Sequence, residues 1–289
     1  MKTTTMVLLL FIAIGGILVV LKLSGEQSFE SQKSFDVQQI QLLEIDNESW
    51  NIVLEDTDEE ELVIDISGKK QKKQSDPVEI KEDGTKISVL QHDREEGIFK
   101  NVSLGEKGTV HIAILTNKVP TIRVKNSYGD VNINHLTTKD ITISSDSGYK
   151  VIKELSADKG EFTSKDGELK MTDSNISELT IASTNGDCYI TSVSSPKMKI
   201  SSTSGEVILK EMNEEKSLFV ETKSGDILVS YRTAPQSLML IANSESSDIT
   251  VKLKGLKIEK NTKDSIEGRM GEAENRVELK NKAGIMNVQ

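Results

Sequence analysis

The chain has 289 residues and a formal net charge of −10, with 36% apolar and only 4% aromatic residues. This acidic balance argues against nucleic-acid binding, because attraction to phosphates needs clustered lysine and arginine side chains. A single cysteine, Cys188, excludes an intramolecular disulfide framework and a cysteine-based zinc site, and the three histidines lack metal-ligand spacing.

Residues 1–23 are expected to form one transmembrane helix that contacts membrane lipid. Positions 6–21 read MVLLLFIAIGGILVVL without a charge, and a bilayer core of ~30 Å needs about 20 helical residues. The exit sequence VVLKLSGEQS lacks the small-residue pattern of a signal peptidase site, which favours an uncleaved anchor over a cleaved signal peptide. The predicted anchor includes Met6, Leu10, Ile14, Leu18 and Leu21.

We expect the N-terminus to lie inside the cell and the bulk of the chain to lie outside the membrane. The flanking residues Lys2 and Lys22 give only a weak charge asymmetry. However, the short segment before the apolar run is easily retained while the long polar remainder is exported. Residues 24–34, SGEQSFESQKS, are predicted to form a short polar stalk.

Residues 35–120 contain strand-like runs without a constant period. Runs such as VQQIQLLEI, ELVIDISG and TVHIAIL are separated by the charged segments DTDEEE, KKQKK and HDREEG. Charge runs of this kind are usually solvated turns. The pattern predicts either a β-rich N-terminal cap or an irregular start of the repeat that follows.

Residues 121–289 carry a turn motif that recurs every 19 residues, as in NSYGDVNI and STSGEVIL. The intervals between the motif glycines are 19, 19, 19, 19 and 20 residues, and the glycines are Gly129, Gly148, Gly167, Gly186, Gly205 and Gly225. A degenerate seventh copy has Ser247 at the glycine position. The segment NKAGIMNV, ending at Val288, is interpreted as a last coil that closes the stack.

Apolar residues recur in register with these glycines. Four positions after each glycine stand Ile133, Ile152, Met171, Ile190, Leu209 and Val229. Each unit therefore has two apolar-x-apolar segments, which is the alternation of a β-strand. A constant period predicts an all-β solenoid, similar to a single-stranded β-helix, with coils of about 19 residues whose neighbours supply the core. An antiparallel β-sandwich is the alternative.

The turn residues have structural explanations that compete with functional ones. Each glycine is expected to adopt a positive φ, which glycine reaches without a Cβ penalty. The acids that follow most glycines would stack as a ladder, and calcium binding is the functional alternative to simple turn chemistry. Lys150 stands at an otherwise apolar position behind Tyr149, so that coil is expected to be distorted.

Few side chains suggest catalysis or ligand binding. Cys188 is expected to be a buried structural thiol rather than a reactive one. His111 lies in an apolar strand, and no nucleophile motif such as G-x-S-x-G accompanies it. Trp50 and Tyr128 are the candidates for an exposed platform on which a glycan stacks.

These features together resemble the bacterial putative-adhesin family of β-strand repeat proteins. The resemblance rests on SGDILV at 224–229, NGDCYI at 185–190, the lead-in HIAILTNKVPTIRVKNSYGDVNI and the closing EGRMGEAENRVELKNKAGIMNV, and spans about residues 40–289. With one N-terminal anchor, the chain looks like the membrane-anchored LiaG-like proteins encoded with regulators of cell-envelope stress. The resemblance implies an extracytoplasmic β-solenoid linked to that stress response, with no family-wide catalytic residues.

We therefore predict a single-pass protein of the cell membrane without catalytic activity, metal or cofactor. The favoured function is an interaction or scaffold role at the bacterial cell envelope, with an envelope protein or a wall polymer as partner and no nucleic acid. The alternative is an adhesin or wall-polysaccharide-binding module. An enzyme on the solenoid face is the third possibility.

Overall fold

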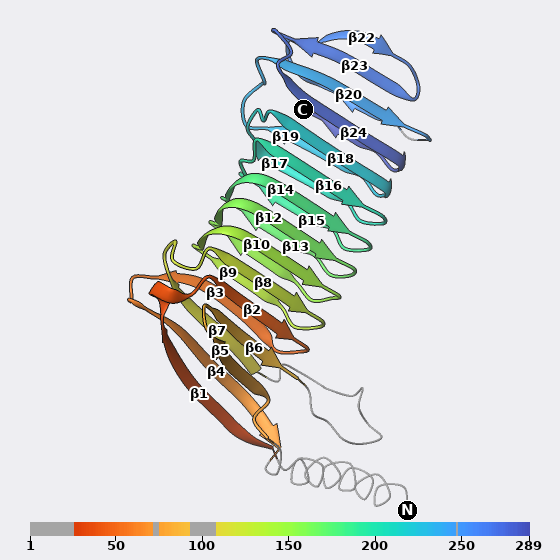
Figure 1. The fold of residues 1–289 in the computed structure, drawn as a ribbon. Helices are drawn as coiled ribbons and strands as arrows, with labels where there is room; N and C mark the ends of the chain where they lie inside the picture. The colour runs from red at the N-terminus through yellow and green to blue at the C-terminus, as the bar shows by residue number, and fades with distance from the viewer. Residues whose placement is uncertain (1–25, 72–74, 93–107, 247) are drawn as a thin grey trace, which may run out of the picture.

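The computed structural model describes residues 26–71, 75–92, 108–246 and 248–289, which form an all-β chain (Figure 1). The strands make two long sheets of 12 and 13 strands, here called sheet A and sheet B. A single 3-10 helix, Val37–Gln39, accompanies them in this part of the chain. No helix among the described residues is long and apolar enough to cross a membrane. The predicted anchor at residues 1–23 lies outside the described residues.

Sheet A contains 12 strands, which are in spatial order β1 (Glu26–Asp36), β4 (Glu61–Gln71), β7 (Gly108–Leu115), β3 (Asn51–Thr57), β9 (Val131–Asn134), β11 (Lys150–Lys153), β13 (Leu169–Thr172), β15 (Cys188–Thr191), β17 (Val207–Met212), β19 (Ile227–Tyr231), β25 (Met286–Val288) and β21 (Ile249–Val251).

Sheet B contains 13 strands, which are in spatial order β22 (Lys257–Asn261), β23 (Ser265–Met270), β20 (Leu238–Ser244), β24 (Asn275–Ala283), β18 (Ser217–Ser224), β16 (Lys197–Ser202), β14 (Asn175–Ser183), β12 (Ser156–Ser164), β10 (Thr137–Ser145), β8 (Thr121–Asn126), β2 (Leu42–Asn47), β6 (Lys86–Gln91) and β5 (Val78–Asp83).

The middle of the molecule is a solenoid-like stack in which each coil gives one strand to each sheet. Ile152 pairs in parallel with Ile133 on one side and with Met171 on the other, and Ile190 follows Met171. These side chains are fully buried between the sheets, and burial of each contributes about 1.5–3 kcal/mol. The 19-residue stacking predicted from the sequence is thus confirmed. The pairing is parallel, so the antiparallel sandwich is not the fold of the repeats.

The N-terminal coils do not stack in chain order. Strands β2 and β3 lie directly on β8 and β9, although residues 58–120 separate them in sequence. The coil made by β6 and β7 lies on the far side of β2 and β3. Antiparallel strands β1, β4 and β5 then cover this end. Residues 35–120 therefore contain both coils of the stack and a cap.

The C-terminal coil is also out of order, which corrects the interpretation of NKAGIMNV. This segment does not close the stack. Val288 pairs with Val229 on one side and with Val251 on the other, so β25 lies between β19 and β21. In sheet B, β24 lies between β18 and β20 in the same way. Figure 1 shows the C-terminus within the stack, while β22 and β23 form the tip.

The predicted polar stalk is also corrected. Residues 26–36 form β1, which pairs with β4 along its entire length, from Glu26 with Gln71 to Asp36 with Glu61. Phe29 from this strand is buried, and Lys70 lies 4.7 Å from the centre of its ring. The two phenylalanines of FESQKSF, Phe29 and Phe35, therefore pack on the core as part of the cap.

Candidate functional site

The six predicted glycines form one column at the corner where each coil passes from sheet B to sheet A. A Cβ atom on Gly148 would lie 2.3 Å from the carbonyl oxygen of Gly129, and one on Gly205 would lie 2.2 Å from that of Gly186. The column continues to Gly284, whose Cβ would meet the oxygen of Gly225 at 2.5 Å. Glycine is required at this corner because successive turns approach too closely for any side chain.

The expected positive φ explains only half of the column. Gly148, Gly167 and Gly225 have φ values of 88°, 85° and 151°, whereas the other three glycines lie outside that region. The prediction is therefore wrong for Gly129, Gly186 and Gly205. All six share the close approach of the preceding coil, and that contact explains the glycine at every position.

A buried polar column supports the glycine turns from inside. It lies three residues before each glycine, and its members include Asn126, Ser145, Ser183 and Ser202. The Ser202 hydroxyl donates to the Gly205 carbonyl at 3.1 Å and accepts from the Gly205 N–H at 3.0 Å. Buried polar groups need such partners, so these serines are structural rather than catalytic.

The acidic column uses its aspartates to join successive turns. The carboxylate of Asp130 accepts the N–H of Tyr149 at 2.8 Å, and that of Asp187 accepts the N–H of Glu206 at 2.9 Å. Within the described residues, no group of three or more His, Cys, Asp or Glu is arranged to hold a metal ion. Turn chemistry therefore accounts for the aspartates, and the structure gives the calcium alternative no support.

Lys150 fills the apolar column rather than distorting its coil. Its side chain is almost fully buried, and β11 keeps parallel register with both neighbouring strands. The ammonium donates to the hydroxyl of Ser164 at 2.5 Å and to the carbonyl of Asp166 at 3.1 Å. Burial away from water lowers the pKa of Lys150 to about 8.

The remaining candidates divide between core and surface. Cys188 is buried, and desolvation raises the pKa of its thiol to about 12, so it is unreactive in the folded protein. His111 bonds to Glu55 at 2.8 Å and lies 3.9 Å from Asp65, on three neighbouring strands of sheet A. Trp50 is buried and is no glycan platform, whereas Tyr128 is 68% exposed.

A groove of about 510 Å³ crosses five coils on the outer side of sheet B, beside the glycine corner. We call it the hydroxyl groove, because serine and threonine occupy most of the positions that line it, four, three and two residues before the glycines. The hydroxyls of Thr163, Thr184 and Thr203 make no hydrogen bond to other described residues. They are therefore available to a ligand.

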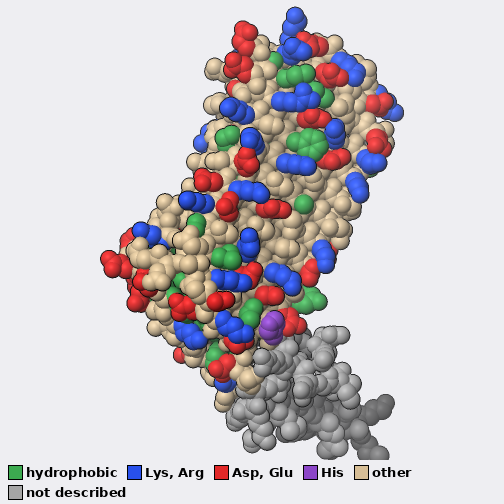
Figure 2. All heavy atoms as spheres, viewed as in Figure 1, with side chains coloured by type: hydrophobic (Ala, Val, Ile, Leu, Met, Phe, Trp, Pro, Cys, Tyr) green, Lys and Arg blue, Asp and Glu red, His purple; other side chains and the backbone are tan. Residues whose placement is uncertain are grey.

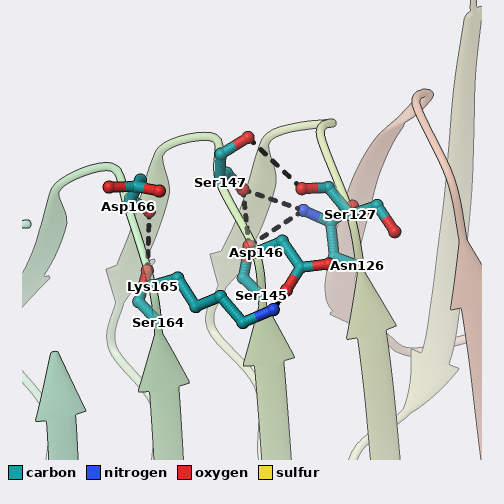
Figure 3. Close-up of polar contacts among 8 residues, drawn as sticks. All are labelled: Asn126, Ser127, Ser145, Asp146, Ser147, Ser164, Lys165 and Asp166. Carbon is teal, nitrogen blue, oxygen red and sulfur yellow. Dashed lines mark hydrogen bonds and ion pairs between the residues drawn. The ribbon is translucent and has the colours of Figure 1, made fainter. Parts of the chain in front are cut away.

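Charged side chains at the groove are paired or balanced. Lys165 contacts the carboxylate of Asp146 at 2.5 Å across one coil step, as Figure 3 shows, and this ion pair raises the pKa of Lys165. At the other end, Glu221 and Lys223 line the groove together. Figure 2 shows basic and acidic side chains intermixed along the visible face. The groove therefore has no dominant sign of charge.

Sequence reasoning missed two features of the corners. The hydroxyl groove has a signal, because Ser or Thr recurs four and two residues before several glycines. At the opposite corner, six residues after each of the first five glycines, non-glycine residues adopt positive φ values of 49° to 56°. They are His135, Glu154, Asp173, Ser192 and Glu211. Their polar character was visible, but their backbone conformation had no glycine to reveal it.

The Toastrack DUF4097 family matches residues 40–289, so the chain belongs to this family. The match covers the repeats, both out-of-order coils and most of the cap. The chain matches no curated protein sequence.

Two solved structures from bacteria are similar to this chain. A putative adhesin from Bacteroides fragilis is 15% identical, has a TM-score of 0.55, and aligns over 90% of this chain and 97% of its own. A putative adhesin from Parabacteroides distasonis is 11% identical over the same shares, with a TM-score of 0.45. At 15% identity, the similarity to the Bacteroides fragilis structure supports the fold alone.

Proposed function

We propose, from the premise that this chain is a Toastrack family member, that it is a non-catalytic recognition module that binds an extended polymer of the cell envelope. The observation that carries the proposal is the hydroxyl groove, which crosses five rigid coils and has free hydroxyls along it. A ligand that spans several coils must itself be extended. A wall polysaccharide or the glycan surface of another cell has this shape, which is consistent with an adhesin.

The module is held at the membrane by the apolar segment 6–21, with the N-terminus inside and the repeats outside the cytoplasm. This part of the proposal rests on the sequence, because the uncharged run 3–21, which contains this segment, approaches the length of a bilayer span and the segment has its composition. A role in the envelope-stress response comes only from the resemblance to LiaG-like proteins. Protease added to intact protoplasts tests the topology, and it is expected to digest the repeats. Protection of the repeats would contradict it.

The function is tested by retention of the full chain, solubilised in detergent, on purified cell-wall glycan and on glycan-free membranes. We expect retention on the glycan that soluble glycan fragments displace. A chain that is retained by neither material would contradict the proposal. Hydrolysis of the glycan during incubation would show that the protein is an enzyme instead.

A scaffold for another envelope protein is the second candidate, and a surface of sheet A favours it. The outward side chains of Tyr189, Ile208 and Leu228 are half-buried and follow one another on β15, β17 and β19. Proximity labelling from the exported domain tests this function. Labelling of one membrane protein that is lost in an Ile208→Asp, Leu228→Asp variant supports the scaffold.

A further inference from the structure

We propose that the hydroxyl groove takes a neutral polysaccharide, lying along the axis of the stack, and that Tyr128 stacks on a sugar at its N-terminal end. This inference rests on the proposed function and specifies the ligand class, its direction and the residues that recognise it. Four observations carry it: the spacing of free hydroxyls, the balance of charge, the methyl group of Ala182 and the exposed phenol beside the groove.

The hydroxyls repeat at the distance between neighbouring strands. Thr184 and Thr203 occupy equivalent positions on successive coils, and parallel strands lie ~4.8 Å apart. One sugar unit of an extended polysaccharide has a comparable length. A hydroxyl is both donor and acceptor, so each coil can exchange hydrogen bonds with the hydroxyl groups of one sugar. A chain that lay along a single strand would use only one of these positions.

The groove favours an uncharged chain. Its lysines, Lys165 and Lys223, are offset by Asp146 and Glu221, and Lys165 already contacts Asp146. An anionic wall polymer would therefore gain no net attraction, and it would have to compete with the carboxylate for Lys165. The whole chain has a formal net charge of −10, which adds repulsion for a polyanion.

One methyl group, that of Ala182, interrupts the hydroxyls that line the groove. Ala182 lines the middle of the groove, between Thr163 and Ser201 on the neighbouring strands. Pyranose rings present C–H groups on their faces, and these faces pack on apolar and aromatic groups rather than on hydroxyls. The C–H face of a sugar ring packs on the Ala182 methyl group, while the hydroxyls of Thr163 and Thr184 contact the edge of the same ring.

Tyr128 does not line the groove itself but lies on the next turn toward the N-terminal cap, one coil beyond the groove's first lining residues, Ser144 and Ser145. Its side chain is 68% exposed, and its phenol lies close enough to Lys165 for an electrostatic interaction. Its backbone is held rigidly, because its N–H donates to the carbonyl of Glu48 at 2.8 Å. A large exposed aromatic ring on a rigid turn gives a flat surface for stacking.

Binding of the full chain in detergent to immobilised laminarin and dextran, two neutral glucans, and to alginate, an acidic polysaccharide, tests the inference. We expect binding to at least one glucan, and weaker binding to alginate at every salt concentration. The Thr163→Val, Thr184→Val variant should bind about tenfold or more weakly, since each lost hydrogen bond weakens binding several-fold. The Thr172→Val, Thr191→Val variant on sheet A is the matched control and should bind like the parent.

Two further variants separate stacking from other roles of Tyr128. Tyr128→Ala should bind about tenfold more weakly, whereas Tyr128→Phe should keep the parent's affinity because the ring remains. The coil of Tyr128 and the coil of Thr203 are four coil steps apart, or ~19 Å. A disaccharide should therefore compete much less well than a pentasaccharide.

The possible results distinguish failure of the inferred ligand class from failure of the proposed function. If the Thr163→Val, Thr184→Val variant and the Tyr128→Ala variant both bind glucan as the parent does, the inference is overturned but the proposed function is not. Preferential binding to alginate that high salt abolishes shows an acidic ligand and also overturns it. A full chain that binds neither the glucans nor alginate, but is retained on wall glycan, likewise overturns the ligand class. Failure on every glycan contradicts the proposed function itself.

Discussion

Single residues at the glycine corner show how closely the coils approach. The Gly205 Cβ position lies 2.2 Å from the Gly186 carbonyl oxygen, which is far inside van der Waals contact. Gly205 does not have a positive φ, so an effect of alanine here isolates the steric contact from backbone strain. The methyl group of an alanine at position 205 would have to push two coils apart, although their strands are hydrogen-bonded on either side of the corner.

Gly205→Ala is expected to lower the free energy of unfolding by about 1–3 kcal/mol, as overpacking in a well-packed core does. Ser204→Ala, at the exposed neighbouring position of the same turn, is the control and should leave stability unchanged. Chemical denaturation measures both. Equal stability of the two variants would show that the coils separate without cost.

Lys150 is a buried cation in an apolar column, and its burial should make stability depend on pH. Its pKa is about 8 in the folded protein and 10.5 when unfolded, so between these values the unfolded chain binds more protons. Stability therefore rises as the pH rises from about 8 to 10.5, and the penalty is fully present below pH 8. The difference corresponds to about 3 kcal/mol.

Lys150→Met is expected to raise the free energy of unfolding at pH 7 by about 1–3 kcal/mol, because an apolar side chain of similar shape replaces a buried charge. The rise in stability between pH 8 and 10.5 should shrink as well. Lys153→Met, exposed on the same strand, is the control. Denaturation curves at pH 7 and pH 10 measure the free energy of unfolding of both variants. A Lys150→Met protein less stable than the parent would show that the hydrogen bonds of Lys150 to Ser164 and Asp166 outweigh the cost of its desolvation.

At the scale of the strand and turn, each coil is bonded to the next through side chains as well as through the ladder. Asp187 illustrates this, because its carboxylate accepts the N–H of Glu206 on the following coil. Glu206 occupies the equivalent position, yet its carboxylate accepts no hydrogen bond from other described residues. The short aspartate side chain reaches the next turn, and the longer glutamate extends away from it.

The Asp187→Ala variant is expected to lose about 1–2 kcal/mol of stability, because the carboxylate accepts the N–H of Glu206 and, at 3.3 Å, the hydroxyl of Tyr189. The amide of Glu206 should also lose protection from hydrogen exchange, because the Asp187 carboxylate is the partner of its N–H. Glu206→Ala removes a carboxylate from the same column without this effect and serves as control. Unchanged exchange at residue 206 in the Asp187 variant would contradict this function for the aspartates.

Elements with a constant period could be predicted from the sequence, and those without one could not. Ile133, Ile152 and Met171 were placed correctly, because stacked coils repeat the same side chain in the same position. β1 was missed because its polar residues, Gln32 and Lys33 among them, resemble a linker until β4 is placed beside it. The hydroxyl groove was missed because Ser and Thr before a glycine are also what a turn requires.

At the scale of the whole molecule, both ends of the stack are built out of chain order. The C-terminal coil of β24 and β25 separates β18 and β19 from β20 and β21. Stacks of this kind are stabilised mainly by neighbouring coils. Residues 275–289 are therefore needed to attach the tip to the rest of the stack. No sequence period reveals this insertion, because a parallel strand can pair with any other strand whose apolar residues stand in the same register.

Removal of residues 275–289 should detach the tip and leave the middle of the stack folded. Hydrogen exchange is expected to become fast in β20, β22 and β23, since β20 loses its parallel partner, whereas β10, β12 and β14 keep the protection of the full chain. The protected middle is the internal control. A truncated chain whose tip remains as protected as before would show that β20 rejoins β18 directly.

The displaced end coils also determine how this protein can change length during evolution. A duplicated unit of 19 residues added after β25 would have no vacant place, because β25 is already enclosed between β19 and β21. One added before β1 would meet an antiparallel cap and not a coil of the stack. The same duplication inserted between Gly129 and Gly225 would leave the cap and the enclosed strand β25 with their present partners. Related genes should therefore differ by whole units in the centre, while their beginnings and endings keep the same plan.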